Sequence, residues 1–210
     1  MALTNEQIAR YSRQIIIPKM GGRAQERLLS SRLAIIAALE DLEEPLTYLV
    51  GAGVGDIDLC VPGNHEGRLR STCARMRDLN PDSTVSYGSI AQVPDVVFAI
   101  LGNDEVVRFA AAEIPGAAPA VIARLDAPGK IAVLPSPPPC ARCTSGGLLD
   151  VFSARSDQAG LITMAATTEA LKLLAGYEAE TTSILIRFEG PQTRSEPLKQ
   201  AKSDCSCSHA

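Results

Sequence analysis

Largely apolar runs of four to six residues alternate with longer segments of mixed polarity through most of the chain. The runs that read as strands span residues 32–37, 57–61, 84–87, 96–101, 120–123 and 130–134. Helical composition is found between them, at residues 40–50, 68–79 and 104–113. Because parallel strands need helical crossovers, this alternation predicts an α/β fold, a Rossmann-like, doubly wound and mainly parallel sheet.

The N-terminal segment carries a helix-start signal. The Thr4 hydroxyl can accept a hydrogen bond from the amide of Gln7, and the Gln7 side chain can reach back to Thr4. This arrangement predicts a capping box and a helix that follows it. Pro18 and the pair Gly21-Gly22 then interrupt the pattern.

The last third of the chain differs in composition. A proline-rich stretch at residues 135–139 predicts extended backbone, and residues 159–174 predict a long apolar helix that ends at Gly176. Residues 182–188 predict a late strand. The polar tail, residues 192–210, is expected to be loose except near its cysteines.

Length and charge fit an ordinary globular protein. The 210 residues carry 20 basic and 24 acidic side chains, which gives a formal net charge of −4, and 46% of the residues are hydrophobic. We expect one domain over residues 1–210, with a nucleotide-fold core at 1–134 and a crossover and tail region at 135–210. There is no membrane-length apolar run, no secretory signal pattern at the start and no basic stripe for nucleic acid. The expected location is the cytoplasm.

Six cysteines add a metal-binding hypothesis. Cytosolic thiols stay reduced, so the close pairs Cys140/Cys143 and Cys205/Cys207 favour a metal over disulfides. Cys60 lies in an apolar run and is expected to be a buried small side chain.

Several short motifs match one family in the same order. They lie at residues 3–15, 25–32, 52–57, 80–81, 102–103, 129–133, 139–143 and 168–176. Among them, Ala52-Gly53-Val54-Gly55-Asp56-Ile57 matches a turn of the form A-G-V-G-x-(I/L). Together these segments resemble the MoeB/ThiF/HesA family, the adenylating enzymes related to ubiquitin-activating enzymes.

The resemblance implies a Rossmann-like sheet that binds Mg-ATP. It implies a partner protein whose C-terminal Gly-Gly tail attacks the α-phosphate to form an acyl adenylate. It also implies dimers in which an arginine, aligned here with Arg13, reaches the nucleotide of the other subunit. The alternative for Arg13 is a salt bridge on the helix surface.

The resemblance further implies a zinc site that ties the tail to the crossover region. Its four ligands would be Cys140, Cys143, Cys205 and Cys207. The second pair has one intervening residue where the family has two, and His209 can replace either of its cysteines. A complete tetrahedral site has no open position, so its Zn²⁺ would be structural. The alternatives are metal-free thiols or a frayed tail.

The glycine-rich phosphate loop of the family has no counterpart in this sequence. Its G-x-G-G-x-G pattern falls on Ala37, Ala38, Leu39, Glu40, Asp41 and Leu42. Glycines in such loops allow positive φ and let backbone amides approach phosphate. Here the leucines add bulk and the acids repel a polyphosphate. We interpret the change as loss of nucleotide binding, so ATP and Mg²⁺ are not expected as cofactors, and no residue is assigned a catalytic role.

Other catalytic positions of the family are also changed. The family's metal-binding aspartate is replaced by Gly102, which precedes Asn103, and its ribose-binding acid falls on residues 61–63. Asp104 is the nearest substitute carboxylate for Mg²⁺. Arg70 is the candidate for the place of the phosphate-binding lysine.

The remaining polar features have simple structural interpretations. One predicted helix carries a basic cluster, formed by Arg68, Arg70, Arg75 and Arg77. We expect a solvated face paired with acids, with anion binding as the alternative. His65 has no nearby nucleophile pattern, and helix capping explains Asp41 and Glu44.

These features predict a non-catalytic member of the adenylating family. It would act as a dimerising partner or scaffold, homodimeric or heterodimeric, for an active relative or for a small ubiquitin-like sulfur carrier protein. The alternative is an active ATP-dependent adenylyltransferase that activates the C-terminus of such a carrier through an unorthodox nucleotide site. A dinucleotide-binding oxidoreductase is a third hypothesis, which the missing G-x-G-x-x-G disfavours.

Overall fold

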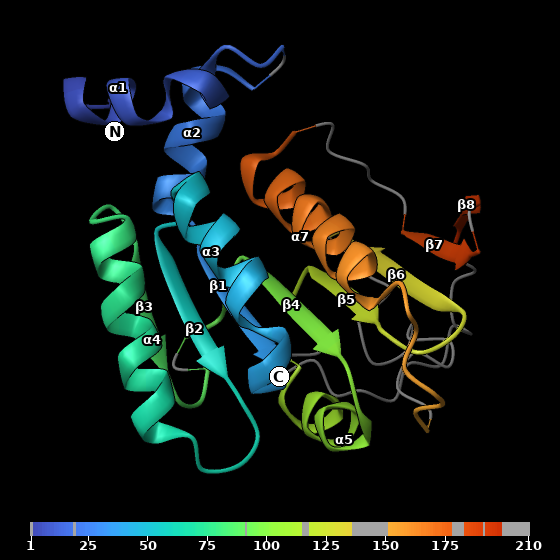
Figure 1. Ribbon diagram of the computed structural model, residues 1–210. Helices are drawn as coiled ribbons and strands as arrows, with labels where there is room; N and C mark the ends of the chain where they lie inside the picture. The colour runs from blue at the N-terminus through green and yellow to red at the C-terminus, as the bar shows by residue number, and fades with distance from the viewer. Residues whose placement is uncertain are drawn as a thin grey trace.

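The computed structural model describes residues 2–18, 20–90, 92–114, 118–135, 151–177, 183–190 and 192–198. These residues build an eight-stranded sheet flanked by helices (Figure 1). The strands are β1 (Arg32–Ala37), β2 (Asp56–Cys60), β3 (Thr84–Tyr87), β4 (Val96–Leu101), β5 (Ala120–Arg124), β6 (Gly129–Leu134), β7 (Ile184–Glu189) and β8 (Gln192–Pro197). The helices are α1 (Asn5–Ile15), α2 (Gly21–Ser30), α3 (Glu43–Ala52), α4 (Glu66–Leu79), α5 (Asp104–Glu113) and α7 (Ala159–Ala175), with a 3₁₀ turn, η1 (Leu39–Asp41).

The sheet is mixed, with a parallel majority. Its strand order is β3-β2-β1-β4-β5-β6-β7-β8. The pairs from β3 to β5 are parallel, and those from β5 to β8 are antiparallel. The predicted α/β class with a mainly parallel, doubly wound sheet is therefore confirmed.

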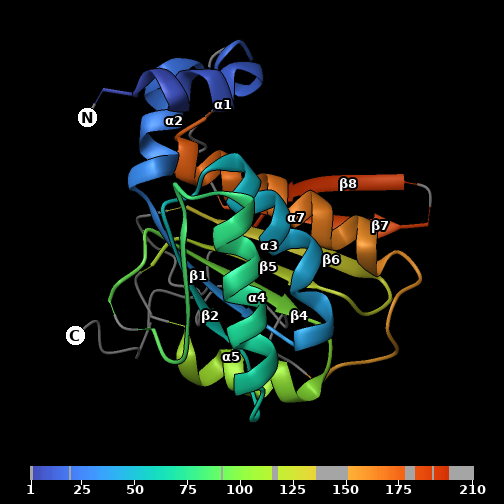
Figure 2. The same ribbon diagram turned by 60° about the vertical axis from the view of Figure 1, so that its left-hand side comes forward.

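Each face of the sheet has its own core, because successive strand residues point to opposite faces. On β1, Leu33 and Ile35 join the cluster under α2, α3, α4 and α7, whereas Ile36 joins the cluster that includes α5. Figures 1 and 2 show α3, α4 and α7 on one face and α5 on the other. Strand β4 is buried along its whole length, which explains why all six of its residues are apolar.

Most predicted elements are confirmed, and several bounds agree residue for residue. The predicted interruption at Pro18 and Gly21-Gly22 is confirmed, because α1 ends at Ile15 and a new helix, α2, begins at Gly21. One prediction near a proline was wrong in detail. The single helix expected over residues 40–50 is η1 followed by α3, because Pro45 has no amide to donate to residue 41.

The tail prediction was wrong for residues 192–197, which form β8 at the edge of the sheet. This strand pairs with β7 after a turn at Gly190, whose φ is 62°. Arg187 and Glu196 form an ion pair across the hairpin at 2.8 Å. All six side chains of β8 are exposed, so its polar sequence shows no hydrophobic period. Within the described ranges, no helix is both long and apolar enough to cross a bilayer.

Candidate functional site

The candidate site lies where strand order reverses in the parallel half of the sheet. Strand β1 has β2 on one side and β4 on the other, and all three run in the same direction. In open α/β sheets, ligands bind in the crevice beyond the carboxyl ends of the strands at this point. The backbone that borders it is η1, after β1, and the Gly102-Asn103 turn, after β4.

The turn after β1 is packed into the protein instead of open to a ligand. Ala37, Ala38 and Leu42 are buried, and Leu39 packs against the core from a partly exposed position. Ala38 is extended and Leu42 is in the right-handed helical region, so neither residue needs the positive φ that glycine allows. The turn thus has none of the glycines whose positive φ lets backbone amides approach a phosphate closely.

An ion pair occupies the space beyond the carboxyl end of β4. The Arg155 guanidinium donates to both carboxylate oxygens of Asp41, with Nη1 at 3.2 Å from Oδ2 and Nη2 at 2.5 Å from Oδ1. The Asp41 side chain is 4% exposed and that of Arg155 is 46% exposed. A Cβ placed on Gly102 would lie 2.0 Å from Asp41 Oδ2, so glycine is required for this close approach. The hydrogen bonds to Asp41 raise the pKa of Arg155.

The capping interpretation of Asp41 and Glu44 was therefore wrong. Neither η1 nor α3 has a side-chain hydrogen bond at its N-cap. Asp41 is committed to Arg155, a partner 114 positions away in the sequence. The Glu44 side chain is exposed on the first turn of α3, where a carboxylate complements the positive end of the helix dipole.

A short segment, residues 151–156, carries Arg155 across the carboxyl edge. The Phe152 amide donates to Asp104 Oδ1 at 2.7 Å, and the Ser156 amide donates to the Leu125 carbonyl at 2.8 Å. Asp126 and Arg155 form an isolated antiparallel bridge. Asp104, the substitute metal ligand suggested by the sequence, thus holds this segment in place.

A second, buried ion pair supports the same segment and was not found by sequence reasoning. Arg124 Nε donates to Asp126 Oδ2 at 2.9 Å, and its Nη2 donates to the Val151 carbonyl at 2.6 Å. Burial raises the pKa of Asp126, but hydrogen bonds from Arg124 and Ser153 outweigh burial and hold that pKa below its ordinary value. The Phe152 ring centroid lies 5.8 Å from the Arg124 guanidinium carbon. In the sequence, the only sign of this ion pair is that the opposite charges of Arg124 and Asp126 lie at the end of an apolar strand.

The mouth of the crevice opens into an acidic groove of about 750 Å³. Glu40, Glu43 and Glu44 line it from exposed positions, together with Asp41 and Arg155. The hydrogen bond and charge of Arg75 lower the pKa of Glu43, so this acid stays ionised. These residues do not fit a nucleotide triphosphate, because like charges repel at close range and Asp41 fills the space next to Gly102.

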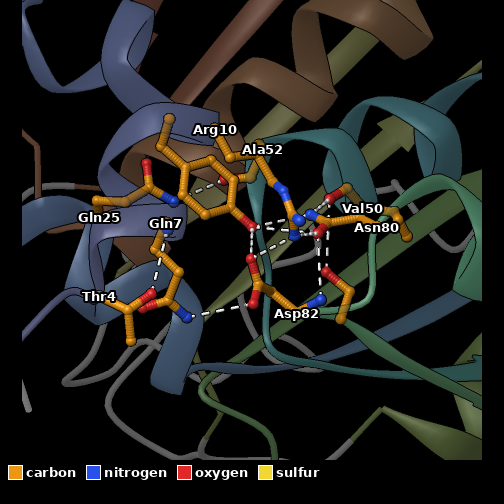
Figure 3. Close-up of polar contacts among 10 residues, drawn as sticks. Thr4, Gln7, Arg10, Gln25, Val50, Ala52, Asn80 and Asp82 are labelled. Carbon is orange, nitrogen blue, oxygen red and sulfur yellow. Dashed lines mark hydrogen bonds and ion pairs between the residues drawn. The ribbon is translucent and has the colours of Figure 1, made fainter.

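The N-terminal motif builds a polar cluster at the C-terminal end of α3, close to Val50 (Figure 3). Tyr11, 1% exposed, donates its hydroxyl to Asp82 at 3.0 Å and accepts from Asn80 Nδ2 at 2.9 Å. Asn80 Nδ2 also donates to the Val50 carbonyl at 2.6 Å, and Arg10 pairs with Asp82 at 2.7 Å. Burial raises the pKa of the Tyr11 hydroxyl. We call Arg10, Tyr11, Asn80 and Asp82 the N-terminal cluster.

Other parts of the motif set have structural roles around this cluster. Gly53 has a φ of 86°, and a Cβ there would lie 2.7 Å from the Tyr11 ring, so glycine is required on both grounds. Gln25 donates to the Ala52 carbonyl at 2.9 Å. The Thr4–Gln7 capping box is confirmed, with both hydrogen bonds present.

The remaining predicted residues lie apart from the crevice. Arg13 is exposed on α1 and makes no ion pair with a described residue. Arg70 pairs with Glu66 on α4 at 2.7 Å, and Arg75 pairs with Glu43 at 2.8 Å, as expected for a solvated face. Cys60 is buried, which confirms its packing role, and burial raises its pKa to about 12.

The predicted zinc ligands are outside the described residues. These are Cys140, Cys143, Cys205, Cys207 and the alternative ligand His209. Among the residues that are described, no group of three or more His, Cys, Asp or Glu side chains is arranged to hold a metal. The zinc site stays a prediction.

No protein-family model matches the chain. It is 25% identical over 249 residues to the Aedes aegypti adenylyltransferase and sulfurtransferase MOCS3, covering 97% of this chain and 56% of that protein. It is 28% identical over 132 residues to the SAMP-activating enzyme E1 of Haloferax volcanii, covering 55% of this chain and 49% of that protein. The chain spans about half the length of the curated relatives it matches.

Solved structures share the fold. Escherichia coli MccB with succinimide superposes with a TM-score of 0.63 at 14% identity, covering 92% of this chain and 73% of that one. PaaA gives a TM-score of 0.58 at 14% identity, with 94% and 75% covered. The fold and its edge crevice thus define a Rossmann-type α/β protein whose fold is shared with MccB and PaaA. Its sequence relatives narrow the comparison further, because they are MOCS3 proteins and a SAMP-activating enzyme E1, to which this chain is similar in sequence.

Proposed function

We propose that the chain is a non-catalytic relative of the adenylyltransferases and acts as a dimerising partner or scaffold. The observation that carries this proposal is the Asp41–Arg155 ion pair against Gly102. It puts side chains of the protein itself where the fold class places its ligand. The acids around it form a negative groove mouth, which disfavours a triphosphate.

The names of the relatives support the type of partner. MOCS3 is an adenylyltransferase and sulfurtransferase, and the Haloferax protein activates SAMP. We infer that this chain associates with an active protein of that kind or with a ubiquitin-like sulfur carrier, as a homodimer or as a heterodimer. Arg13, which is exposed, is available to contact such a partner.

Titration calorimetry with MgATP tests the loss of nucleotide binding. The wild-type chain is expected to show no heat of binding, whereas MccB, which has been solved with ATP, serves as the positive control. Micromolar binding, or pyrophosphate exchange with a ubiquitin-like carrier, would support the active adenylyltransferase instead.

The zinc proposal has its own test. Cys140→Ser is expected to lower the bound zinc measured by elemental analysis and to lower the melting temperature, because a structural zinc contributes directly to folding. Cys73→Ala, which removes a buried thiol of α4, is the matched control and should leave metal content unchanged. Equal zinc content in the Cys140→Ser and Cys73→Ala variants would contradict the proposed zinc site.

A further inference from the structure

The face of the molecule formed by α3 and α7 has opposite charges at its two ends. Helix α3 begins at the carboxyl edge of the sheet, beside the acidic groove, and its other end lies against the N-terminal cluster, where Asn80 Nδ2 donates to the Val50 carbonyl. Figures 1 and 2 show α1 and α2 at that second end. Residues 1–32, which contain both helices, carry six basic and two acidic side chains in a chain whose net charge is −4. The face therefore has a negative end and a positive end.

The negative end has two carboxylates that form no ion pair within the described part of the chain. Asp41 and Glu43 are each paired with an arginine of this chain, as described above. Glu40 and Glu44 are exposed, line the same groove and have no such partner among the described residues. A guanidinium group stays charged and binds carboxylates through several N–H donors at once. The groove therefore fits an arginine side chain supplied from outside the chain.

Arg13, at the positive end, is a cation without an acid. It is exposed on α1 and makes no ion pair with a described residue. It directly precedes Gln14, which lines an apolar groove of about 690 Å³ between α1, α3 and α7. Helix α3 rises about 15 Å over its 10 residues, so the acidic groove lies at the far end of the face from Arg13 of the same chain. One copy of the chain thus carries the cation and the acids on one face without joining them.

Two-fold symmetry brings the two ends together. An axis perpendicular to α3 makes the α3 helices of two copies antiparallel, so the N-terminal end of α3 in one copy lies against the C-terminal end of α3 in the other. The acidic groove of each copy then faces α1 of the other copy, and the contact occurs twice. Between the two ends the face is apolar, because Tyr48 of α3 is 61% exposed and Leu161 of α7 is 60% exposed. An apolar centre with a polar and charged rim is typical of a protein–protein interface.

We propose that Glu40 and Glu44 form a guanidinium site, and that Arg13 of a second copy of this chain completes it. Arg13 donates to the two carboxylates from across the two-fold axis, so the protein supplies both the cation and the anions and the site needs no nucleotide. The inference rests on the proposed dimerising role and deepens it, because it names the partner and the contact. Because ion pairs at the rim of an interface are screened by salt, the homodimer should weaken as salt is added.

Sedimentation velocity with the full chain, over a range of concentrations, measures the dissociation constant of the dimer. Arg13→Glu, and separately the double reversal Glu40→Arg/Glu44→Arg, should each raise that constant at least about tenfold, because each places like charges against each other twice. The matched reversals Arg108→Glu and Glu105→Arg lie at exposed positions of α5, on the opposite face of the sheet. Each of them should leave the dissociation constant within about twofold of the wild-type value.

Mixing the two kinds of reversed chain is the decisive measurement. In a mixed dimer of the Arg13→Glu chain with the Glu40→Arg/Glu44→Arg chain, one contact is native and the other has its charges exchanged. The dissociation constant should therefore return to within about threefold of the wild-type value, which also shows that both variants are folded. No recovery on mixing, unchanged dimerisation of either reversed chain alone, or a wild-type chain that stays monomeric over the whole range would overturn the proposal.

Failure of this inference is distinguishable from failure of the proposed function. A monomeric chain that binds MOCS3 in the same sedimentation experiment would overturn the inference and keep the scaffold role. MgATP binding in calorimetry would contradict the non-catalytic role and leave the result of the mixing experiment unchanged.

Discussion

The N-terminal cluster and the edge crevice use their polar side chains differently. In the cluster, Tyr11 and Asn80 are buried in contact with each other and join α1 to the end of α4. In the crevice, Asp41 is bonded to Arg155 from a distant segment, at the edge where this fold places its ligands. The comparison shows that polar side chains stabilise the fold in the first region, whereas in the second they bond to each other at the ligand-binding edge of the sheet.

The largest effect is expected from breaking the N-terminal cluster. Asn80→Ala removes the donor to the Val50 carbonyl and the partner of the Tyr11 hydroxyl, both buried. Because unsatisfied buried polar groups each cost about 1–3 kcal/mol, we expect a loss of about 3 kcal/mol in the free energy of unfolding, measured by urea denaturation. Asp78→Ala, at an exposed position in the last turn of α4, is the control and should stay within about 0.5 kcal/mol. A change below about 1 kcal/mol for Asn80→Ala would contradict the structural role.

Breaking the crevice ion pair should have a smaller effect. Arg155→Ala leaves the Asp41 carboxylate buried without its partner, but the Arg155 side chain is 46% exposed, so water screens the pair. We expect about 1.5 kcal/mol of destabilisation. The double variant Asp41→Ala/Arg155→Ala should be less destabilised than the sum of its two single variants, since it leaves no unpaired charge. Additive effects in this cycle would mean that the pair does not form.

The pH dependence of stability tests the Arg124–Asp126 ion pair, which holds residues 151–156 next to the crevice. The pKa of Asp126 is held below its ordinary value in the folded chain. The folded state thus binds fewer protons than the unfolded state, and the contribution of Asp126 is present above its unfolded pKa and lost as pH falls through its folded pKa. The melting temperature should therefore fall as pH drops below about 4. Asp126→Asn should make that fall shallower, and an unchanged slope would contradict the lowered pKa.

The difference between the two regions also explains what the sequence could predict. Strands β1 and β4 were predicted correctly because burial on both faces makes all their residues apolar except Arg32, a local signal. The capping box at Thr4 was equally local. By contrast, Asp41 and Arg155 are 114 positions apart, and no spacing rule joins them. Strand β8 was missed because an edge strand with exposed side chains has no hydrophobic period.

The smallest effect on stability is expected at Arg13, which is proposed to contact a partner. This residue is exposed on α1 and makes no ion pair with a described residue, unlike Arg10 one turn earlier, which pairs with Asp82. Arg13→Ala should therefore change the free energy of unfolding by less than about 0.5 kcal/mol. If Arg13 contacts a partner subunit, the same variant should weaken association measured by sedimentation, while Arg23→Ala, on α2, should not. Loss of stability at Arg13 without any change in association would assign it to the fold, and the retained N-terminal motif would then be structural throughout.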